Sequence, residues 1–213
     1  STLLASSAAS DVYKRQKLLC PFQYFGVSDF VDLSELKWTR GGYEVSELEN
    51  VYVLDTEKAK RRAQDIITNT IKYVDDIENV KALGFCVSIK HAEFMANEFN
   101  NAGIPSIALT GNSNDEIRKN AAKNLTDGNI KVIFTVDLFN EGVDIPQINT
   151  ILFLRPTESL TIFLQQLGRG LRISEGKECL TVLDFIGQSN KNYKFADKYR
   201  ACLLYTSPSP RDA

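Results

Sequence analysis

Between residues 51 and 201, hydrophobic residues occur in two alternating patterns: longer segments place them at helical spacing, and shorter segments are hydrophobic almost throughout. The first pattern predicts helices over Thr56–Tyr73, Lys90–Asn101, Asn114–Leu125 and Leu160–Leu171. The second predicts strands over Ala82–Val87, Ser106–Leu109, Ile130–Val136, Thr150–Leu154 and Leu180–Phe185. Apolar strands separated by helices indicate an α/β fold in which helices cover both faces of a mostly parallel sheet.

Residues 17–50 lack this periodicity. They contain scattered aromatic residues and a Gly41-Gly42 break, and we interpret them as a connector between domains. The single methionine, Met95, lies well inside the chain, so we expect the sequence to be a piece of a longer protein.

The two ends of the chain also carry no clear pattern. Residues 1–16 are rich in Ser and Ala, and residues 202–213 end in a Ser-Pro repeat that cannot continue a helix. Both segments resemble translated adaptor sequence. We therefore expect them to be non-native or disordered tails that take no part in the fold.

Composition narrows the class of protein. Of 213 residues, 43% are hydrophobic and 24% are charged, which is typical of a globular protein and excludes a wholly disordered chain. The net charge is −2, so nucleic-acid binding would have to come from a local surface rather than an overall positive charge. No apolar run approaches the roughly 18 to 20 residues of a membrane helix, and no signal peptide opens the chain. We expect a cytoplasmic protein without a membrane partner.

Metal chemistry is not expected. The four cysteines are scattered without a C-x-x-C pair, at positions Cys20, Cys86, Cys179 and Cys202. The only histidine, His91, cannot complete a zinc site with them at ordinary ligand spacing. We expect the thiols to be reduced, and we interpret His91 as a solvated residue at a helix start rather than as a polar contact in a cleft.

The most specific string is QQLGRGLR, residues 165–172. It places Arg169 and Arg172 on one helical face with Gln165 a turn earlier, so that two guanidinium groups can converge on one anion. Arginine suits the oxygens of a transferring phosphoryl group because its charged, planar fork donates two hydrogen bonds at once. An exposed basic helix is the alternative, but it would not need Gly168, which costs about 1 kcal/mol relative to alanine inside a helix.

A second string, DLFNEGVDIP at residues 137–146, directly follows a predicted strand and so lies where a parallel sheet places its ligands. Gly142 lets the backbone approach a ligand closely. Asp144 has a carboxylate that can orient a ribose hydroxyl or a neighbouring arginine. Alone, a carboxylate just before Pro146 is also consistent with a simple turn.

The order of these strings resembles the second RecA-like domain of superfamily-2 helicases of the DEAD/DEAH-box type. The family's QxxGRxxR motif VI is matched by Gln165, Gly168, Arg169 and Arg172, and the GxDxP end of motif V by Gly142, Asp144 and Pro146. The strings GFCVS at 84–88 and LTG at 109–111 resemble motif IV and the loop after the next strand. The likeness spans about Ala82–Gly187, and a looser likeness that includes Cys20–Trp38 is to bacterial helicases of the restriction and defence type.

The resemblance implies a RecA-like three-layer domain over residues 51–201, with a central, mostly parallel sheet flanked by helices. It also implies an ATP site, in which Arg169 and Arg172 contact the γ-phosphate. By the same resemblance, Gln165 and Gly168 lie near these arginines in the ATP site. Gly142 and Asp144 line the part of the site that holds the sugar of the nucleotide.

The resemblance further implies a grip on nucleic acid. Ser88, Thr110 and Gly111 would hold backbone phosphates through hydroxyl and N–H groups, without reading bases. Motif V has a threonine at the position of Val136, and here Thr135 lies one step away. DNA is expected as the nucleic acid rather than RNA.

The chain contains no G-x-x-x-x-G-K-[ST] loop and no Asp-Glu box after a strand. The resemblance places these elements, and with them Mg²⁺, in a preceding RecA-like domain of the same parent chain, so we expect the fragment alone to be inactive. The alternative is a stand-alone RecA-like module that binds nucleic acid or protein without hydrolysis. A dinucleotide-dependent oxidoreductase is excluded because the G-x-G-x-x-G turn is missing.

Overall fold

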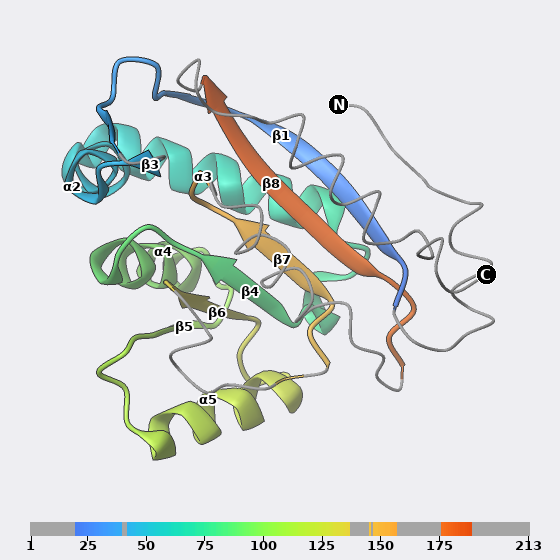
Figure 1. Cartoon of the computed structure of the whole chain (residues 1–213). Helices are drawn as coiled ribbons and strands as arrows, with labels where there is room; N and C mark the ends of the chain where they lie inside the picture. The colour runs from blue at the N-terminus through green and yellow to red at the C-terminus, as the bar shows by residue number, and fades with distance from the viewer. Residues whose placement is uncertain (1–19, 40–41, 137–144, 146, 157–175, 189–213) are drawn as a thin grey trace, which may run out of the picture.

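The computed structural model describes residues 20–39, 42–136, 145, 147–156 and 176–188. Its main feature is a six-stranded sheet in the order β1-β8-β7-β4-β6-β5, in which every neighbouring pair is parallel. The strands are β1 (Phe22–Asp32), β4 (Ala82–Phe85), β5 (Ser106–Leu109), β6 (Val132–Thr135), β7 (Thr150–Phe153) and β8 (Leu180–Gln188). Figure 1 shows the strands running side by side with their carboxyl ends toward the same edge. The predicted parallel sheet is confirmed.

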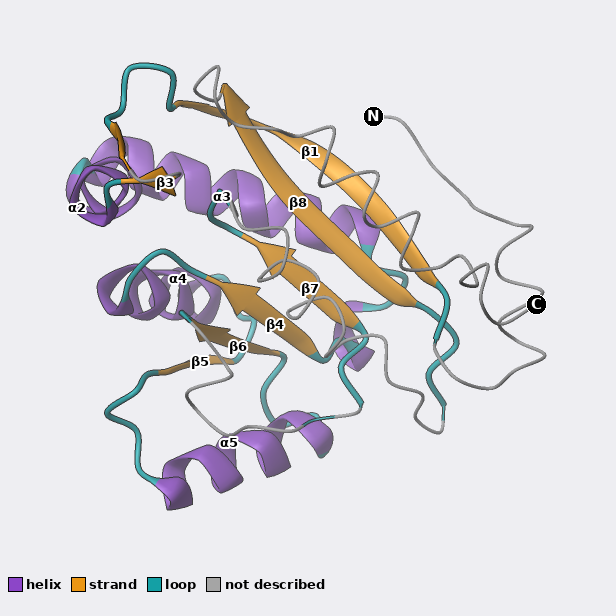
Figure 2. Cartoon of the chain, viewed as in Figure 1, coloured by secondary structure: helices purple, strands orange, loops and turns teal. Residues whose placement is uncertain are grey.

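Helices cover the two faces of this sheet (Figure 2). The long helices are α3 (Thr56–Tyr73), α4 (Ile89–Asn101) and α5 (Asp115–Thr126). Apolar side chains of α3 and α4 pack with one set of strand residues, and those of α5 pack with the alternate set. Because successive strand side chains point to opposite faces, this division gives the three-layer arrangement expected from the sequence.

The helix boundaries follow local capping signals. Helix α3 begins and ends at the predicted residues, and its N-cap Asp55 accepts a hydrogen bond from the backbone N–H of Lys58. Helices α4 and α5 are capped in the same way by Ser88 and Asn114. The predicted helix Leu160–Leu171 lies outside the described residues.

The interpretation of residues 17–50 as an irregular connector is wrong for a large part of the segment. Residues 22–32 form β1, the longest strand, which pairs in parallel with β8 and lies at one edge of the sheet. The sheet therefore starts well before residue 51, the predicted start of the domain. Between Ser28 and Asp32 the register shifts, so three residues of β1 lie opposite Gly187 alone. In this bulge Asp29 is buried and Phe30 is exposed, so the sequence lacks the hydrophobic alternation that would have identified a strand.

The rest of this segment folds into a small substructure beside the sheet. It comprises the antiparallel pair β2 (Trp38–Thr39) and β3 (Gly42–Tyr43), helix α2 (Val45–Glu49), and the π-helical turn η1 (Asn50–Leu54). Its buried residues Tyr43, Leu48 and Tyr52 form a cluster with Val87, at the start of the turn into α4. The segment before α3 is thus packed against the carboxyl edge of the sheet. A short 3₁₀ helix, η2 (Ile77–Asn79), precedes β4.

Candidate nucleic-acid interface at the carboxyl edge of the sheet

The structure places the described candidate residues at one edge of the sheet. Ser88 follows β4, and Thr110 and Gly111 follow β5, so all three lie past the carboxyl ends of parallel strands. The other six candidates lie outside the described residues: Gly142, Asp144, Gln165, Gly168, Arg169 and Arg172. The segments that contain them follow β6, which ends at Thr135, and β7, which ends at Phe153.

Ser88 is half-buried and its hydroxyl is already engaged. Its Oγ accepts a hydrogen bond from the backbone N–H of His91 over 3.2 Å, which caps α4. The same hydroxyl donates to Oε1 of Glu49 over 2.9 Å. The second oxygen of Glu49 lies 3.7 Å from the Nζ of Lys90. An acidic residue of the segment before α3 therefore occupies the hydroxyl that the sequence assigned to nucleic acid.

The loop after β5 is held by its own polar groups. The Thr110 backbone N–H donates to Oγ of Ser113, and Oγ1 of Thr110 accepts from the backbone N–H of Asn112. Arg118, which the sequence analysis did not single out, donates from Nη2 to the Gly111 carbonyl over 3.2 Å. A Cβ placed on Gly111 would meet nothing within 4 Å. The fold itself therefore does not require glycine at this position.

Thr135, one step from the family's threonine position, ends β6 and is fully buried. Its side chain lies inside the sheet layer rather than on the surface. The structure thus gives no exposed hydroxyl at Thr135.

A buried ion pair lies beneath this edge. Nε of Arg62, on α3, is 2.6 Å from Oδ2 of Asp29, in the bulge of β1, and both side chains are almost completely buried. Nη2 of Arg62 donates to the Leu154 carbonyl just after β7, over 2.9 Å. The guanidinium also lies over the ring of Tyr52, 3.9 Å from its centroid. The Asp29 carboxylate is further held by the Val31 backbone N–H.

The interpretation of His91 as a solvated residue is wrong. His91 is fully buried, its ring is stacked on Tyr52, and its Nδ1 accepts a hydrogen bond from the backbone N–H of Val87. The neutral ring therefore has its proton on Nε2, which lies 3.5 Å from Nη1 of Arg62. Burial, and then the neighbouring Arg62 charge, lower the pKa of His91 well below its usual value. His91 is neutral and holds the turn that leads to Ser88.

Arg155, next after Leu154, is a second residue that the sequence analysis missed. Its Nε is buried without a hydrogen-bond partner among the described residues. Burial raises the pKa of the neighbouring Cys86 thiol, and the charges of Arg62 and Arg155 oppose this rise only in part. The signal that could have identified Arg155 is an arginine directly before a proline at the end of an apolar strand.

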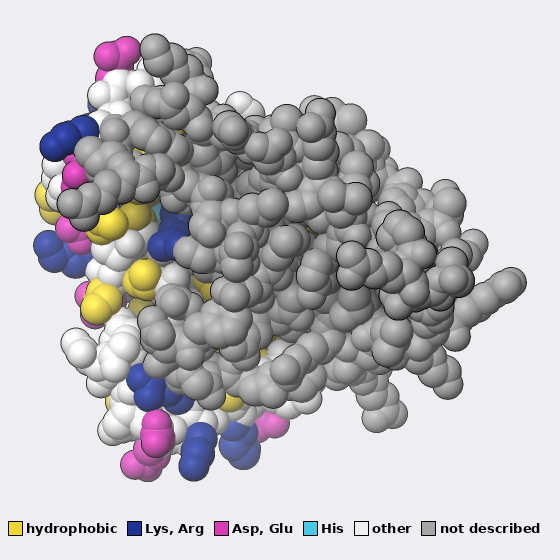
Figure 3. Space-filling model, in the orientation of Figure 1, with side chains coloured by type: hydrophobic (Ala, Val, Ile, Leu, Met, Phe, Trp, Pro, Cys, Tyr) yellow, Lys and Arg dark blue, Asp and Glu magenta, His cyan; other side chains and the backbone are white. Residues whose placement is uncertain are grey.

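The exposed surface of the described part carries charges of both signs. Figure 3 shows Lys and Arg side chains interspersed with Asp and Glu on the face not covered by grey atoms, and hydrophobic side chains between them. No uniformly basic patch is visible there. A grip on phosphates at this edge would thus depend on individual hydroxyl, N–H and guanidinium groups.

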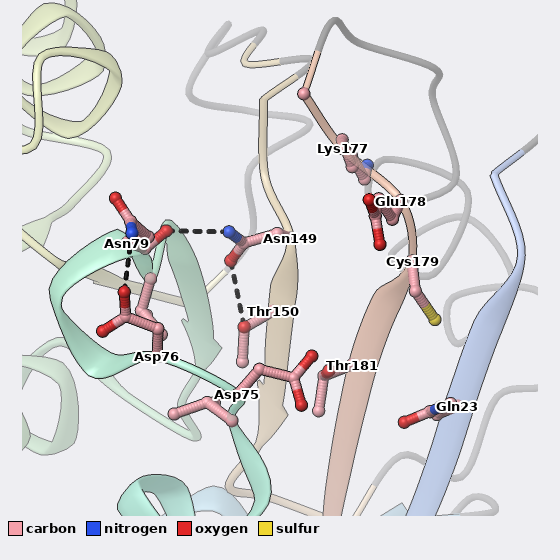
Figure 4. Close-up of a pocket in the computed structure, with 13 residues that line it drawn as sticks. Gln23, Asp75, Asp76, Asn79, Asn149, Thr150, Lys177, Glu178, Cys179 and Thr181 are labelled. Carbon is pink, nitrogen blue, oxygen red and sulfur yellow. Dashed lines mark hydrogen bonds between the residues drawn. The ribbon is translucent and has the colours of Figure 1, made fainter.

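A pocket of about 360 Å³ lies at the opposite, amino edge of the sheet (Figure 4). Its walls include Gln23, Thr150 and Thr181, each near the amino end of its strand. Several of its polar groups bind one another, since Nδ2 of Asn149 donates to the Asn79 carbonyl and Oγ1 of Thr150 donates to Oδ1 of Asn149. These bonds join the turn before β4 to the start of β7.

The described ranges were also compared with the requirements of a metal site and of a membrane-spanning helix. In them, no group of three His, Cys, Asp or Glu side chains is placed to hold a metal ion. Among the same residues, no helix is both long and apolar enough to cross a membrane.

Residues 62–174 match the family described as helicase conserved C-terminal domain. The matched region contains Ser88, Thr110, Gly111 and the ends of β4 to β7. The chain belongs to this helicase C-terminal domain family. The resemblance to the second RecA-like domain of superfamily-2 helicases is thereby confirmed.

Individual relatives agree with this assignment. The chain is 29% identical over 175 residues to IRC3 of Saccharomyces cerevisiae, named as an ATP-dependent helicase, with 82% of this chain and 24% of the relative covered. It is 34% identical over 160 residues to the mitochondrial irc3 of Schizosaccharomyces pombe, covering 73% of this chain and 25% of the relative. The chain thus spans about a quarter of the length of these two helicase relatives.

Among solved structures, the fold is similar to a fragment of an HsdR subunit of a type I restriction enzyme from Vibrio vulnificus YJ016. The TM-score is 0.56 at 25% identity, and the match covers 85% of this chain and 35% of the other. The likeness extends over the RecA-like fold described above.

Proposed function

We propose that this chain is the second RecA-like half of an ATP-dependent helicase or translocase that moves on nucleic acid. The family match over residues 62–174 carries the proposal, because it contains both the described edge of the sheet and the strings assigned to ATP. The two relatives named as ATP-dependent helicases are each about four times longer than the part of them that this chain matches. A parent protein of that length has room for a further RecA-like domain. That domain would be the principal partner of this chain.

On the nucleic-acid side, Thr110 and Gly111 are the central groups of the proposed grip. The fold does not need a glycine at position 111, and Arg118 holds the Gly111 carbonyl. Without a side chain, the backbone there is open to close approach by a phosphate. Ser88 would join this grip once its hydroxyl is released from Glu49. Contacts of this kind hold the sugar-phosphate backbone and leave the base sequence unread.

On the ATP side, the resemblance assigns the remaining candidates. Arg169 and Arg172 would act on the γ-phosphate, because charged planar guanidinium groups stabilise the charge that develops during phosphoryl transfer. The other assigned residues are Gln165, Gly168, Gly142 and Asp144. β6 and β7 end at the same edge of the sheet, which supports a common site for the two segments that follow them. ATP supplies the phosphoryl chemistry, and Mg²⁺ would be held by the preceding domain.

DNA is the proposed nucleic acid. The support is the likeness to a fragment of an HsdR subunit of a type I restriction enzyme. The stand-alone binding module is the competing function. It predicts salt-dependent binding of nucleic acid that does not respond to ATP.

The test is binding of labelled single-stranded DNA and RNA to the chain, followed by fluorescence anisotropy at several salt concentrations. We expect salt-dependent binding, tighter for DNA, that is weakened by Thr110→Val. Thr126→Val is the matched control, because its hydroxyl bonds within α5 to the Ala122 carbonyl. Absence of binding to either nucleic acid would contradict the grip. Response of the binding to added ATP would argue against a passive module.

A further inference from the structure

Arg62 connects two turns at the carboxyl edge of the sheet. One is the turn after β4, where Ser88 lies, and the other is the turn after β7, where Leu154 and Arg155 lie. The guanidinium reaches the first turn through the ring of His91 and the second through the Leu154 carbonyl. A further contact, with Asp29, neutralises its charge inside the protein.

Arg62 meets the first turn through packing rather than through a hydrogen bond, because Nη1 of Arg62 and the protonated Nε2 of His91 are both donors. Nδ1 of His91 accepts the Val87 N–H, and the His91 backbone N–H donates to Oγ of Ser88. Nε2 of the same ring lies 3.5 Å from Nη1 of Arg62. Movement of Ser88 toward a bound phosphate would therefore shift the ring that lies against Arg62.

The contact to the second turn is a direct hydrogen bond. Nη2 of Arg62 holds the Leu154 carbonyl, and the Leu154 N–H donates to the Phe85 carbonyl at the end of β4. Arg155 follows at once, with its Nε buried and unpartnered among the described residues. Displacement of the His91 ring would press on a guanidinium that also holds the Leu154 carbonyl.

We infer that Arg62 is a positioning residue that transmits nucleic-acid binding at Ser88 to the turn carrying Leu154 and Arg155. This inference rests on the proposed function, since it needs a nucleic acid at the first turn. The second turn leads directly into the segment that holds the proposed ATP-side arginines. Arg62 would therefore couple occupation of the nucleic-acid grip to the position of the turn that carries Leu154 and Arg155.

Hydrogen exchange of the full chain, with and without a single-stranded DNA oligonucleotide, tests the inference. In the unaltered protein, DNA should slow exchange in peptides covering both turns, by about fivefold or more, the lower end of usual coupling between sites. Arg62→Lys keeps a positive charge for Asp29, but its single nitrogen cannot reach Asp29 and the Leu154 carbonyl together. We expect this variant to keep the protection around Ser88 and to lose it around Leu154.

Arg61→Lys is the matched control, because Arg61 is the exposed neighbour on α3 and lies over the Phe30 ring. It should behave as the unaltered protein. If Arg62→Lys does not fold by circular dichroism, Asp29→Asn replaces it and should show the same selective loss. A merely structural role would change exchange without DNA at both turns equally, and would leave the DNA-dependent difference intact.

The outcomes separate the two proposals. DNA binding without any protection of the second turn, or equal transmission in Arg62→Lys, would overturn the role of Arg62 while leaving the grip in place. Loss of DNA protection at both turns in Arg62→Lys would also overturn it, because Arg62 would then act on binding itself. Failure of the unaltered chain to bind DNA or RNA would instead overturn the proposed function.

Discussion

Glu49 and Ser88 are joined by a hydrogen bond of 2.9 Å between a carboxylate and the hydroxyl assigned to nucleic acid. The carboxylate belongs to the last residue of α2, in the segment before α3. A negative charge at this position opposes a phosphate that approaches the same hydroxyl. The packing of the segment before α3 therefore affects how readily the grip accepts its ligand.

The first prediction concerns this pair. Glu49→Gln should raise the affinity of the chain for single-stranded nucleic acid about fivefold, which corresponds to the ~1 kcal/mol between two unit charges about 4 Å apart in water. Anisotropy titration at low salt measures it. Glu57→Gln is the control, since Glu57 is an exposed acid in the first turn of α3. Equal effects of the two substitutions would point to general charge repulsion rather than to the contact with Ser88.

The second prediction concerns the ion pair of Arg62 and Asp29. Arg62→Leu leaves Asp29 buried with an uncompensated charge and should lower the free energy of unfolding by about 3–5 kcal/mol. Arg62→Leu combined with Asp29→Leu should cost clearly less than the sum of the single changes, because no lone charge remains. Urea unfolding measures both. Additive losses would show that the pair is not the source of the cost.

The third prediction concerns pH. His91 is neutral when folded, whereas its pKa in the unfolded chain is about 6.5. The unfolded state therefore binds more protons below that value, and stability is full above about pH 6.5 and declines as pH falls, by up to about 1.4 kcal/mol per pH unit. Because the chain has only one histidine, His91→Asn should flatten this part of the curve. An unchanged slope in the variant would assign the decline to carboxylates.

The fourth prediction compares two glycines. A Cβ on Gly84 would collide with the Phe134 ring, so Gly84→Ala should destabilise the chain by about 1–3 kcal/mol. Gly111→Ala meets open space and should leave thermal stability unchanged while it weakens nucleic-acid binding. Melting temperature and anisotropy measured on both variants check the contrast. Unweakened binding by Gly111→Ala would remove this loop from the grip.

The fifth prediction concerns the ATP side. In the longer protein that contains this chain, Arg172→Ala should lower kcat of ATP hydrolysis by about a thousandfold, as loss of an arginine that stabilises the transferring phosphoryl group does. Sequencing the source DNA across the codons for residues 17 and 201 gives the gene for this protein. An ATPase rate that the substitution leaves intact would contradict the proposed role of Arg172.

The sequence predicts those parts of the fold that depend on local signals. Helix α3 begins and ends as expected because an Asp cap precedes a strongly periodic segment, and β5 matches its predicted bounds because it is a short apolar run. Strand β1 was missed because hydrophobicity does not follow burial in its second half, where Asp29 is buried and Phe30 is exposed. Its stability comes from β8, far away in the sequence, which no local pattern reveals.

The candidate site likewise has features that the sequence predicts and features that it does not. Ser88 and Gly111 were placed correctly after strands, because each follows a short apolar run that the sequence identifies as a strand. The burial of His91 was not predictable from its position at the start of α4. It depends on Arg62 and Tyr52, which reach it from two other elements. Networks that join distant elements leave no periodic trace in the sequence.

The pairing of β1 with β8 also sets the timing of folding during synthesis. Phe22 pairs with Leu180, so β1 leaves the ribosome roughly 8 to 30 s before its partner at ordinary rates of about 5–20 residues per second. Throughout that interval Tyr24, Phe25 and Val27, all buried in the finished sheet, have no neighbouring strand. The nascent chain therefore exposes an unpaired, aromatic strand until β8 emerges, and the cell must protect it from association with other chains.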